Sequence, residues 1–206
     1  KYIIGAFVVL ALAVYWGFSS LNLILLALAV SAIVYFFRNP ERISDDDDER
    51  AILSPTDGVI VSIDDEYEDR FVKDDCVCVA IATSLEDAHF IRAPFASIFK
   101  AKNSLHGTFL PIKNEKAKSL NERFAAYFEG EKGHKYAISI IAGSLATKIS
   151  LYKETDNKIR AGERMSFLKS EFQTILYLPK NVELKKAVGE KVKAGESVIG
   201  YFKDTE

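Results

Sequence analysis

Four residue types are scarce in the 206-residue sequence, which has only two cysteines, one methionine, one tryptophan and five prolines. Two cysteines are too few for the disulfide framework of a small secreted scaffold. A basic surplus is also lacking, because 27 Lys and Arg stand against 29 Asp and Glu, a formal net charge of −2. Electrostatic nucleic-acid binders usually carry such a surplus, so we expect no nucleic-acid partner.

Charge is absent altogether from residues 2–37. This stretch contains two apolar runs, Tyr2–Phe18 and Leu21–Phe37, separated by two serines. Each run is long enough for roughly 26 Å of helix, against roughly 30 Å for a hydrocarbon core. A signal peptide has a basic leader and a single apolar stretch, so the tandem runs favour an N-terminal transmembrane helical hairpin over residues 1–38. A hairpin that enters only one leaflet remains an alternative.

Basic residues flank the predicted hairpin, with Lys1 before it and Arg38 and Arg42 after it. Since cytoplasmic flanks are enriched in Lys and Arg, we expect a protein of the cell membrane whose soluble domain faces the cytoplasm. A linker is predicted over residues 39–51, and it contains the acidic run Asp45–Glu49. Five adjacent acids lack the spacing that converges oxygens on one ion, so we interpret the run as solvated rather than metal-binding.

Short β-branched runs bounded by Gly- and Asp-rich turns characterise residues 52–206. They predict a mainly β fold, a β-sandwich of barrel-sandwich type with few short helices. Only residues 121–128 and 142–151 suggest helix. Cys76 and Cys78 lie two apart, so on a strand they share one face, and we expect them to pack there in a reducing cytoplasm.

Seven short motifs follow one another along the chain. They are FRNPER at 37–42, SPTDG at 54–58, DAHFIRAP at 87–94, NER at 121–123, IAG at 141–143, GER at 162–164 and YLP at 177–179. With the apolar hairpin before them, these motifs resemble those of the short, membrane-anchored phosphatidylserine decarboxylases. They extend over nearly the whole of residues 52–206, so the sequence is identified as a member of that family.

The resemblance implies chemistry with a self-made cofactor. In this family the chain cleaves itself before an internal serine, which becomes an N-terminal pyruvoyl group. That ketone forms a Schiff base with the amine of phosphatidylserine and accepts the electrons released when carbon dioxide leaves, so that protonation gives phosphatidylethanolamine. The implied partners are an aminophospholipid and the membrane. The oligomeric state stays open, a homo-oligomer included.

The resemblance also implies roles for three residues. Asp57 and His89 would assist self-cleavage or the proton transfers, with His89 as acid or base. From the residues alone, Asp57 equally suits a structural turn and His89 a buried structural histidine. Arg92, three residues after His89, can contact a substrate phosphate or carboxylate, or form an ordinary ion pair. His106 and His134 match no motif.

The cleavage serine is missing from its expected place. In the family it ends a Phe-Gly-Ser element at a fixed distance before Tyr-Leu-Pro. Counting back from Pro179 places Phe172 at the serine and Glu171 at the glycine. Phenylalanine has no hydroxyl and cannot form a pyruvoyl group. Ser170 takes the catalytic role if the alignment slips by two residues, and Ser144, which follows a glycine, is a second alternative.

Two functions follow from these observations. The first is a decarboxylase that converts phosphatidylserine to phosphatidylethanolamine, if a pyruvoyl group can form. The second is a non-catalytic family member, with Phe172 in place of the serine, that binds an aminophospholipid or a partner protein at the membrane. A third reading, a β-sandwich module that anchors another complex, leaves Asp57 and His89 unexplained.

Overall fold

The computed structural model describes residues 2–16, 20–44, 46, 48–67, 76–114, 116–130, 133–144, 149 and 151–203. The chain divides into two compact units, residues 1–40 and 41–206. The boundary therefore falls after Pro40, and most of the stretch expected to be a linker belongs to the second unit.

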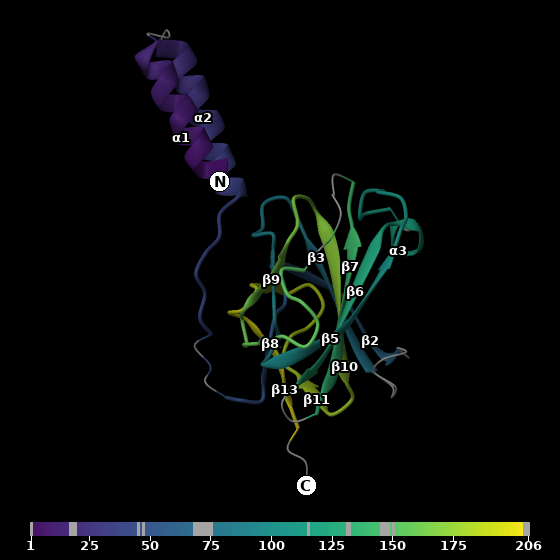
Figure 1. Ribbon diagram of the computed structural model, residues 1–206. Coiled ribbons are helices and arrows are strands. Elements are labelled where there is room, and N and C mark those ends of the chain that lie inside the picture. The colour runs from purple at the N-terminus through teal and green to yellow at the C-terminus, as the bar shows by residue number, and fades with distance from the viewer. Residues whose placement is uncertain are drawn as a thin grey trace. The chain divides into compact units, whose positions relative to one another are not determined.

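The first unit is a pair of helices, α1 (Tyr2–Tyr15) and α2 (Ser20–Phe36), which pack against each other (Figure 1). Both sequences are rich in Ala and Leu, which have high helix propensity. The expected helical pair is present, although Phe18 lies outside the described residues. Within the described ranges, no helix is both long and apolar enough to cross a membrane, so the expectation of transmembrane helices is not supported.

The second unit is mainly β, as expected, with one short helix, α3 (Ala117–Leu120). Its strands are β1 (Ala51–Leu53), β2 (Gly58–Tyr67), β3 (Cys76–Thr83), β4 (Phe90–Arg92), β5 (Ser97–Leu105), β6 (Arg123–Gly130), β7 (Lys135–Ala142), β8 (Lys158–Ile159), β9 (Arg164–Phe167), β10 (Phe172–Pro179), β11 (Val182–Leu184), β12 (Lys191–Val192) and β13 (Val198–Phe202).

The described strands form three antiparallel sheets. The largest has the order β12-β2-β3-β10-β7-β6-β5-β8, and the smaller ones have the orders β1-β13-β11 and β4-β9. One hydrophobic core draws side chains from all three sheets, including Ile52, Ile91 and Leu176. The strand β10 lies in the middle of the largest sheet and pairs with β3 on one side and β7 on the other (Figure 1).

The helix expected at residues 121–128 is wrong, because this segment is mostly the strand β6. Its side chains alternate between buried and half-buried along the whole strand. Phe124 and Phe128 point into the core, and Tyr127 lies on the other face of the sheet. A period of two is the signature of a strand with two different faces, whereas a helix needs a period near 3.6.

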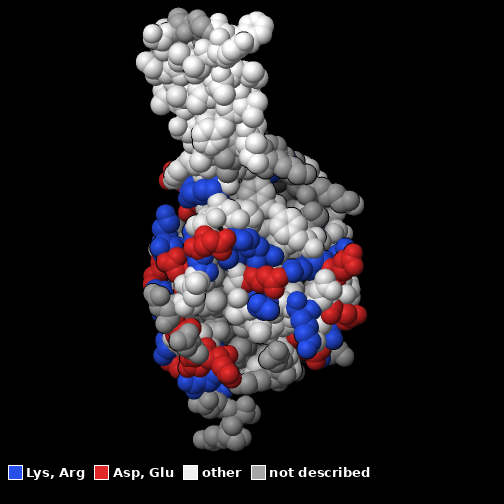
Figure 2. Space-filling model, turned by 60° about the vertical axis from the view of Figure 1, so that its left-hand side comes forward, with Lys and Arg blue, Asp and Glu red and all other residues white. Residues whose placement is uncertain are grey.

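Charged side chains mark a difference between the units. Figure 2 shows the helices without Lys, Arg, Asp or Glu along their length, whereas both signs are mixed over the visible face of the second unit. Several residues of the stretch expected to be a linker take part in polar contacts within the second unit. Tyr201 donates a hydrogen bond to Asp46, and Arg50 forms an ion pair with Asp48. Asp45 and Asp47 lie outside the described residues.

Candidate functional site

The Asp57 turn connects β1 to β2 and is attached to the end of β3. The Ser54 hydroxyl donates to the Thr56 carbonyl at 2.7 Å, and the Thr83 hydroxyl donates to the Asp57 carbonyl at 2.6 Å. Gly58 has a φ of +145°, and a Cβ there would lie 2.1 Å from the Ala82 carbonyl oxygen. The turn therefore needs glycine at this position, both for its backbone conformation and for its close approach to β3.

The Asp57 carboxylate is buried and fully engaged. Arg42 binds both of its oxygens, and the backbone N–H groups of Ala194 and Ala88 donate to them at 2.8 and 3.3 Å. Burial by itself raises the pKa of Asp57, but the Arg42 guanidinium and these N–H donors outweigh it, so the net pKa is lowered. The ionised carboxylate thus holds together three segments that are far apart in the sequence.

His89 follows Ala88 directly and is fully buried. Its Nε2–H donates to the Ser84 carbonyl at 3.1 Å. Its ring lies near two phenylalanines, with centroid distances of 6.3 Å to Phe172 and 6.4 Å to Phe167. The structure thus brings His89 beside the position that the motif spacing assigns to the cleavage serine, and a phenyl ring occupies that position.

Phe172 begins β10 and has no exposed surface. Its backbone lies in register with Thr83 of β3 and Ala142 of β7, so it is paired on both sides. Ser170 is also fully buried, lies before β10, and donates to the Glu171 carbonyl at 3.3 Å. Ser144 is exposed and donates to the Glu171 carboxylate at 3.2 Å. Each candidate serine is therefore hydrogen-bonded to Glu171, the residue at the expected glycine position.

Arg92 lies in a cavity of about 1350 Å³ on which basic side chains converge. It is 5% exposed, and its Nη1 donates to the Gly162 carbonyl at 2.9 Å. Burial, and then the positive charges of Arg164 and Arg42, lower the pKa of the Arg92 guanidinium. The ionisable residues that line this cavity are five cationic and three acidic side chains: Arg42, Arg92, Lys158, Arg160, Arg164, Glu41, Asp46 and Glu163.

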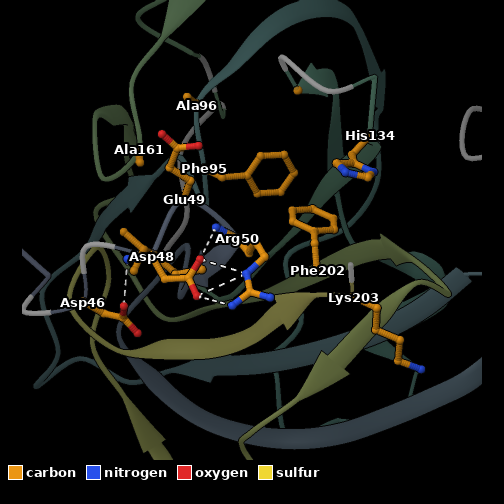
Figure 3. Close-up of a pocket in the computed structure, with 13 residues that line it drawn as sticks. Asp46, Asp48, Glu49, Arg50, Phe95, Ala96, His134, Ala161, Phe202 and Lys203 are labelled. Carbon is orange, nitrogen blue, oxygen red and sulfur yellow. Dashed lines mark hydrogen bonds and ion pairs between the residues drawn. The ribbon is translucent and has the colours of Figure 1, made fainter. Parts of the chain in front are cut away.

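A second cavity, of about 560 Å³, contains His134 and none of the three residues implied by the resemblance (Figure 3). His134 stacks on Phe202 at 4.2 Å between ring centroids, and Phe95 meets Phe202 edge-on at 5.0 Å. Asp48, Glu49 and Arg50 also line this cavity. His106 is exposed near Glu122 and lines neither cavity. Neither His106 nor His134 lines the cavity that contains Arg92.

Fold and site together define a mainly β protein with an ion-paired aspartate turn beside a buried histidine and a basic cavity. The family model for phosphatidylserine decarboxylase matches residues 30–200. The phosphatidylserine decarboxylase proenzyme of Geotalea uraniireducens is 32% identical over 195 residues, covering 90% of this chain and 91% of that protein. The proenzyme of Syntrophotalea carbinolica is 33% identical over 198 residues, covering 96% and 91%. The chain belongs to the phosphatidylserine decarboxylase family.

Phe172, the residue that the motif spacing aligns with the cleavage serine, does not fit the pyruvoyl group on which this family depends. It has no hydroxyl from which that group could form, and its ring is buried in the core. Among the described residues, no cluster of His, Cys, Asp and Glu could hold a metal ion instead. What the site retains is the framework of Asp57 and His89 and the basic cavity at Arg92.

Sequence reasoning missed the partner of Asp57. Arg42 was noticed as the last residue of the first motif and as a basic flank of the hairpin, but not as the counter-ion of a carboxylate 15 residues later. The sequence did contain a signal for this role, because Arg42 belongs to a motif that resembles those of the family and is not only a basic residue beside the apolar runs. The contact between Ser144 and Glu171 could not have been found, since it joins two loops 27 residues apart.

Proposed function

We propose that this protein is a non-processing member of the phosphatidylserine decarboxylase family. It remains one uncleaved chain, makes no pyruvoyl group, and binds the headgroup of an aminophospholipid at the cytoplasmic side of the cell membrane without decarboxylating it. The observation that carries this proposal is Phe172, fully buried beside His89 where the family's motif spacing requires a serine.

The chemistry of processing supports the loss of activity. Self-cleavage before a serine needs a hydroxyl to attack the preceding carbonyl and then leave by elimination. Phe172 offers neither a nucleophile nor a leaving group. Glu171 adds a second obstacle, because its side chain stands where the family has a glycine, and it binds Ser144. Decarboxylation needs an electron sink, and without processing the chain supplies none.

The basic cavity supports the binding half of the proposal. Arg42 is already paired with Asp57, so four cationic side chains face three acidic ones in this lining, a surplus of one positive charge around Arg92. Arginine suits phosphate and carboxylate because its planar guanidinium can donate two parallel hydrogen bonds to either. Burial makes the charged form of Arg92 less favourable, as its lowered pKa indicates, and an anion in this cavity would stabilise that charge. A phospholipid headgroup supplies such an anion.

An active decarboxylase that uses Ser170 is the second candidate. Its support is the position of Ser170, two residues after Leu168, whose backbone N–H donates to the His89 carbonyl at 3.0 Å. In this case the local alignment slips by two residues and Ser170 takes the role of the cleaved serine. The two candidates differ in one measurable property, which is whether the chain is cut.

Mass spectrometry of the purified full chain under denaturing conditions tests the proposal. We expect a single species of about 23.0 kDa. Two fragments, one of them about 4 kDa from the last 37 residues, would overturn it and support cleavage before Ser170. For the binding half, phosphatidylserine-containing micelles should protect the amides around Gly162 from hydrogen exchange in the wild type. The same protection in an Arg160→Gln, Arg164→Gln variant would contradict binding in this cavity.

A further inference from the structure

The connection between β5 and β6 carries apolar side chains that face solvent. Leu105 is 58% exposed, Phe109 39% and Leu120 49%. The bridge between Thr108 and Asn121 and the pairing of Leu105 with Arg123 bring the two ends of the connection together. We call this region the β5–β6 surface, defined by three apolar and three basic residues: Leu105, Phe109, Leu120, Lys113, Lys116 and Lys118.

Hydrogen bonds hold this surface in one conformation. Asn121 is 5% exposed, and its amide donates to the carbonyls of Leu110 and Ala142, each at 2.7 Å. Its Oδ1 accepts the Leu110 N–H at 2.8 Å. Gly107 runs so close that a Cβ there would lie 2.3 Å from the Leu120 carbonyl oxygen. The exposed apolar residues are therefore presented by an anchored loop, and their exposure is a feature of the fold.

The charge of this region is opposite to that of the whole chain. Residues 102–123 contain five Lys and Arg and two Glu, a net charge of +3 in a chain of net charge −2. Within the described part of the chain, no ion pair involves Lys113, Lys116 or Lys118. Exposed apolar side chains in the same connection as lysines without ion pairs match an interface between acyl chains and anionic headgroups.

The β11–β12 connection provides an internal comparison. Val188 there is 57% exposed, as much as Leu105. Its neighbouring lysines are compensated, because Lys185 pairs with Glu183 and Lys186 with Glu190. An exposed apolar residue among paired charges has no preference for an anionic surface. The β5–β6 surface combines both features, and the β11–β12 connection has only one of them.

We propose that the β5–β6 surface docks on an anionic lipid bilayer, with Phe109 and its apolar neighbours in the interface and the lysines at the headgroups. The proposal rests on the membrane association proposed above and names the surface that makes the contact. A bilayer is favoured over an acidic protein because residues 2–37 of the same chain are uncharged and apolar. Docking would hold the domain in a fixed orientation to the lipid it binds.

The experiment uses the fact that the chain has one tryptophan, Trp16. In a full-length Trp16→Phe background, Phe109→Trp places a single fluorescent reporter on the surface. Val188→Trp in the same background is the matched control. Each protein is reconstituted into phosphatidylcholine vesicles and into mixed phosphatidylglycerol–phosphatidylcholine vesicles, both with brominated acyl chains that quench tryptophan at the interface.

We expect strong quenching of the F109W reporter in the anionic vesicles, and little quenching of the V188W reporter in either kind. Changing all three lysines to glutamine, or raising the salt concentration, should reduce the quenching, since each lysine near an anionic surface contributes about fivefold in affinity. Equal quenching of the two reporters would overturn the proposal. The proposal would also be overturned if quenching of the F109W reporter did not change with the salt concentration, with the lysine substitutions or with the phosphatidylglycerol content.

The outcomes separate this inference from the proposed function. If the chain floats with the vesicles but the F109W reporter is not quenched, the membrane association stands and only the assignment of the β5–β6 surface as the docking site is wrong. If the chain does not float with vesicles of either composition, both the membrane association and this surface are wrong. The intact mass of the same preparation reports independently on self-cleavage, which none of these substitutions touches.

Discussion

Phe172 offers the sharpest prediction, because the proposed loss of function and the stability of the fold meet in one side chain. It is fully buried, paired on both sides through the register of β10, and within 6.3 Å of the His89 ring. Phe172→Ala removes a phenyl ring from a close-packed site at the centre of the largest sheet. Such changes cost about 3–5 kcal/mol, which combines lost transfer free energy with the cavity left behind.

For a domain of this size, 1 kcal/mol corresponds to about 2–4 °C in Tm, so we expect Phe172→Ala to lower Tm by about 6–20 °C. Phe172→Leu keeps much of the volume and should cost less than half as much. Phe109→Ala is the matched surface control, because that ring is 39% exposed and its removal should change stability by about 0.5 kcal/mol or less. Thermal unfolding in one detergent, followed by near-ultraviolet circular dichroism, measures all three.

A Phe172→Ala variant as stable as the wild type would refute the reasoning. It would mean that the ring is not a packing element, and that the space beside His89 is available for a ligand or a reactive group. A loss of stability confined to Phe172→Ala, with Phe172→Leu nearly unchanged, is the pattern of a filled core position. This pattern would support the view that the former reactive position has become structural.

The remaining predictions concern the same end of the domain. Glu171→Gly combined with Phe172→Ser restores the hydroxyl and the glycine, and we expect part of the chain to appear as two fragments by intact mass. Arg42→Met leaves the buried Asp57 carboxylate unpaired and should cost about 3–5 kcal/mol in a denaturant titration, of which adding Asp57→Asn recovers part. Because the folded pKa of Asp57 lies below its ordinary value of 3.8, its contribution is complete above that pH and is lost as pH falls through the folded pKa. Acid unfolding of Asp57→Asn should therefore lack this component. Gly58→Ala forces a Cβ against the Ala82 carbonyl at a φ of +145° and should lower stability by about 1–3 kcal/mol, measured in the same titration.

Much of the fold class was predictable, because burial on a sheet has a period of two and β-branched runs follow it. The prediction failed at residues 121–128, where Phe124 and Phe128 are four residues apart, a spacing that also fits one face of a helix. The distinction depended on pairing with the strands β5 and β7, which flank this segment on either side. A single segment contains no information about its neighbours.

The candidate site was predictable only in part, for a related reason. The motifs pointed to Asp57, His89 and Arg92, and all three are buried side chains of the second unit. Their roles depend on distant partners that no local pattern reveals. Asp57 is held by a backbone N–H 137 residues away, and Arg92 by a carbonyl 70 residues away. In the folded protein Asp57 is ion-paired with Arg42, and its expected role in self-cleavage or proton transfer stays a prediction.

By itself, the sequence determined which chemistry each position can perform. Phe172 has no hydroxyl in any fold, residues 2–37 have no charge, and residues 102–123 have a net charge of +3. Only the tertiary structure decided which groups meet. It placed Phe172 against His89 and Arg42 on Asp57, and it left the apolar side chains of the β5–β6 surface exposed. The physical reason is that antiparallel pairing sets β10 between β3 and β7, strands that begin about 96 and 37 residues earlier, so proximity is a property of the whole sheet.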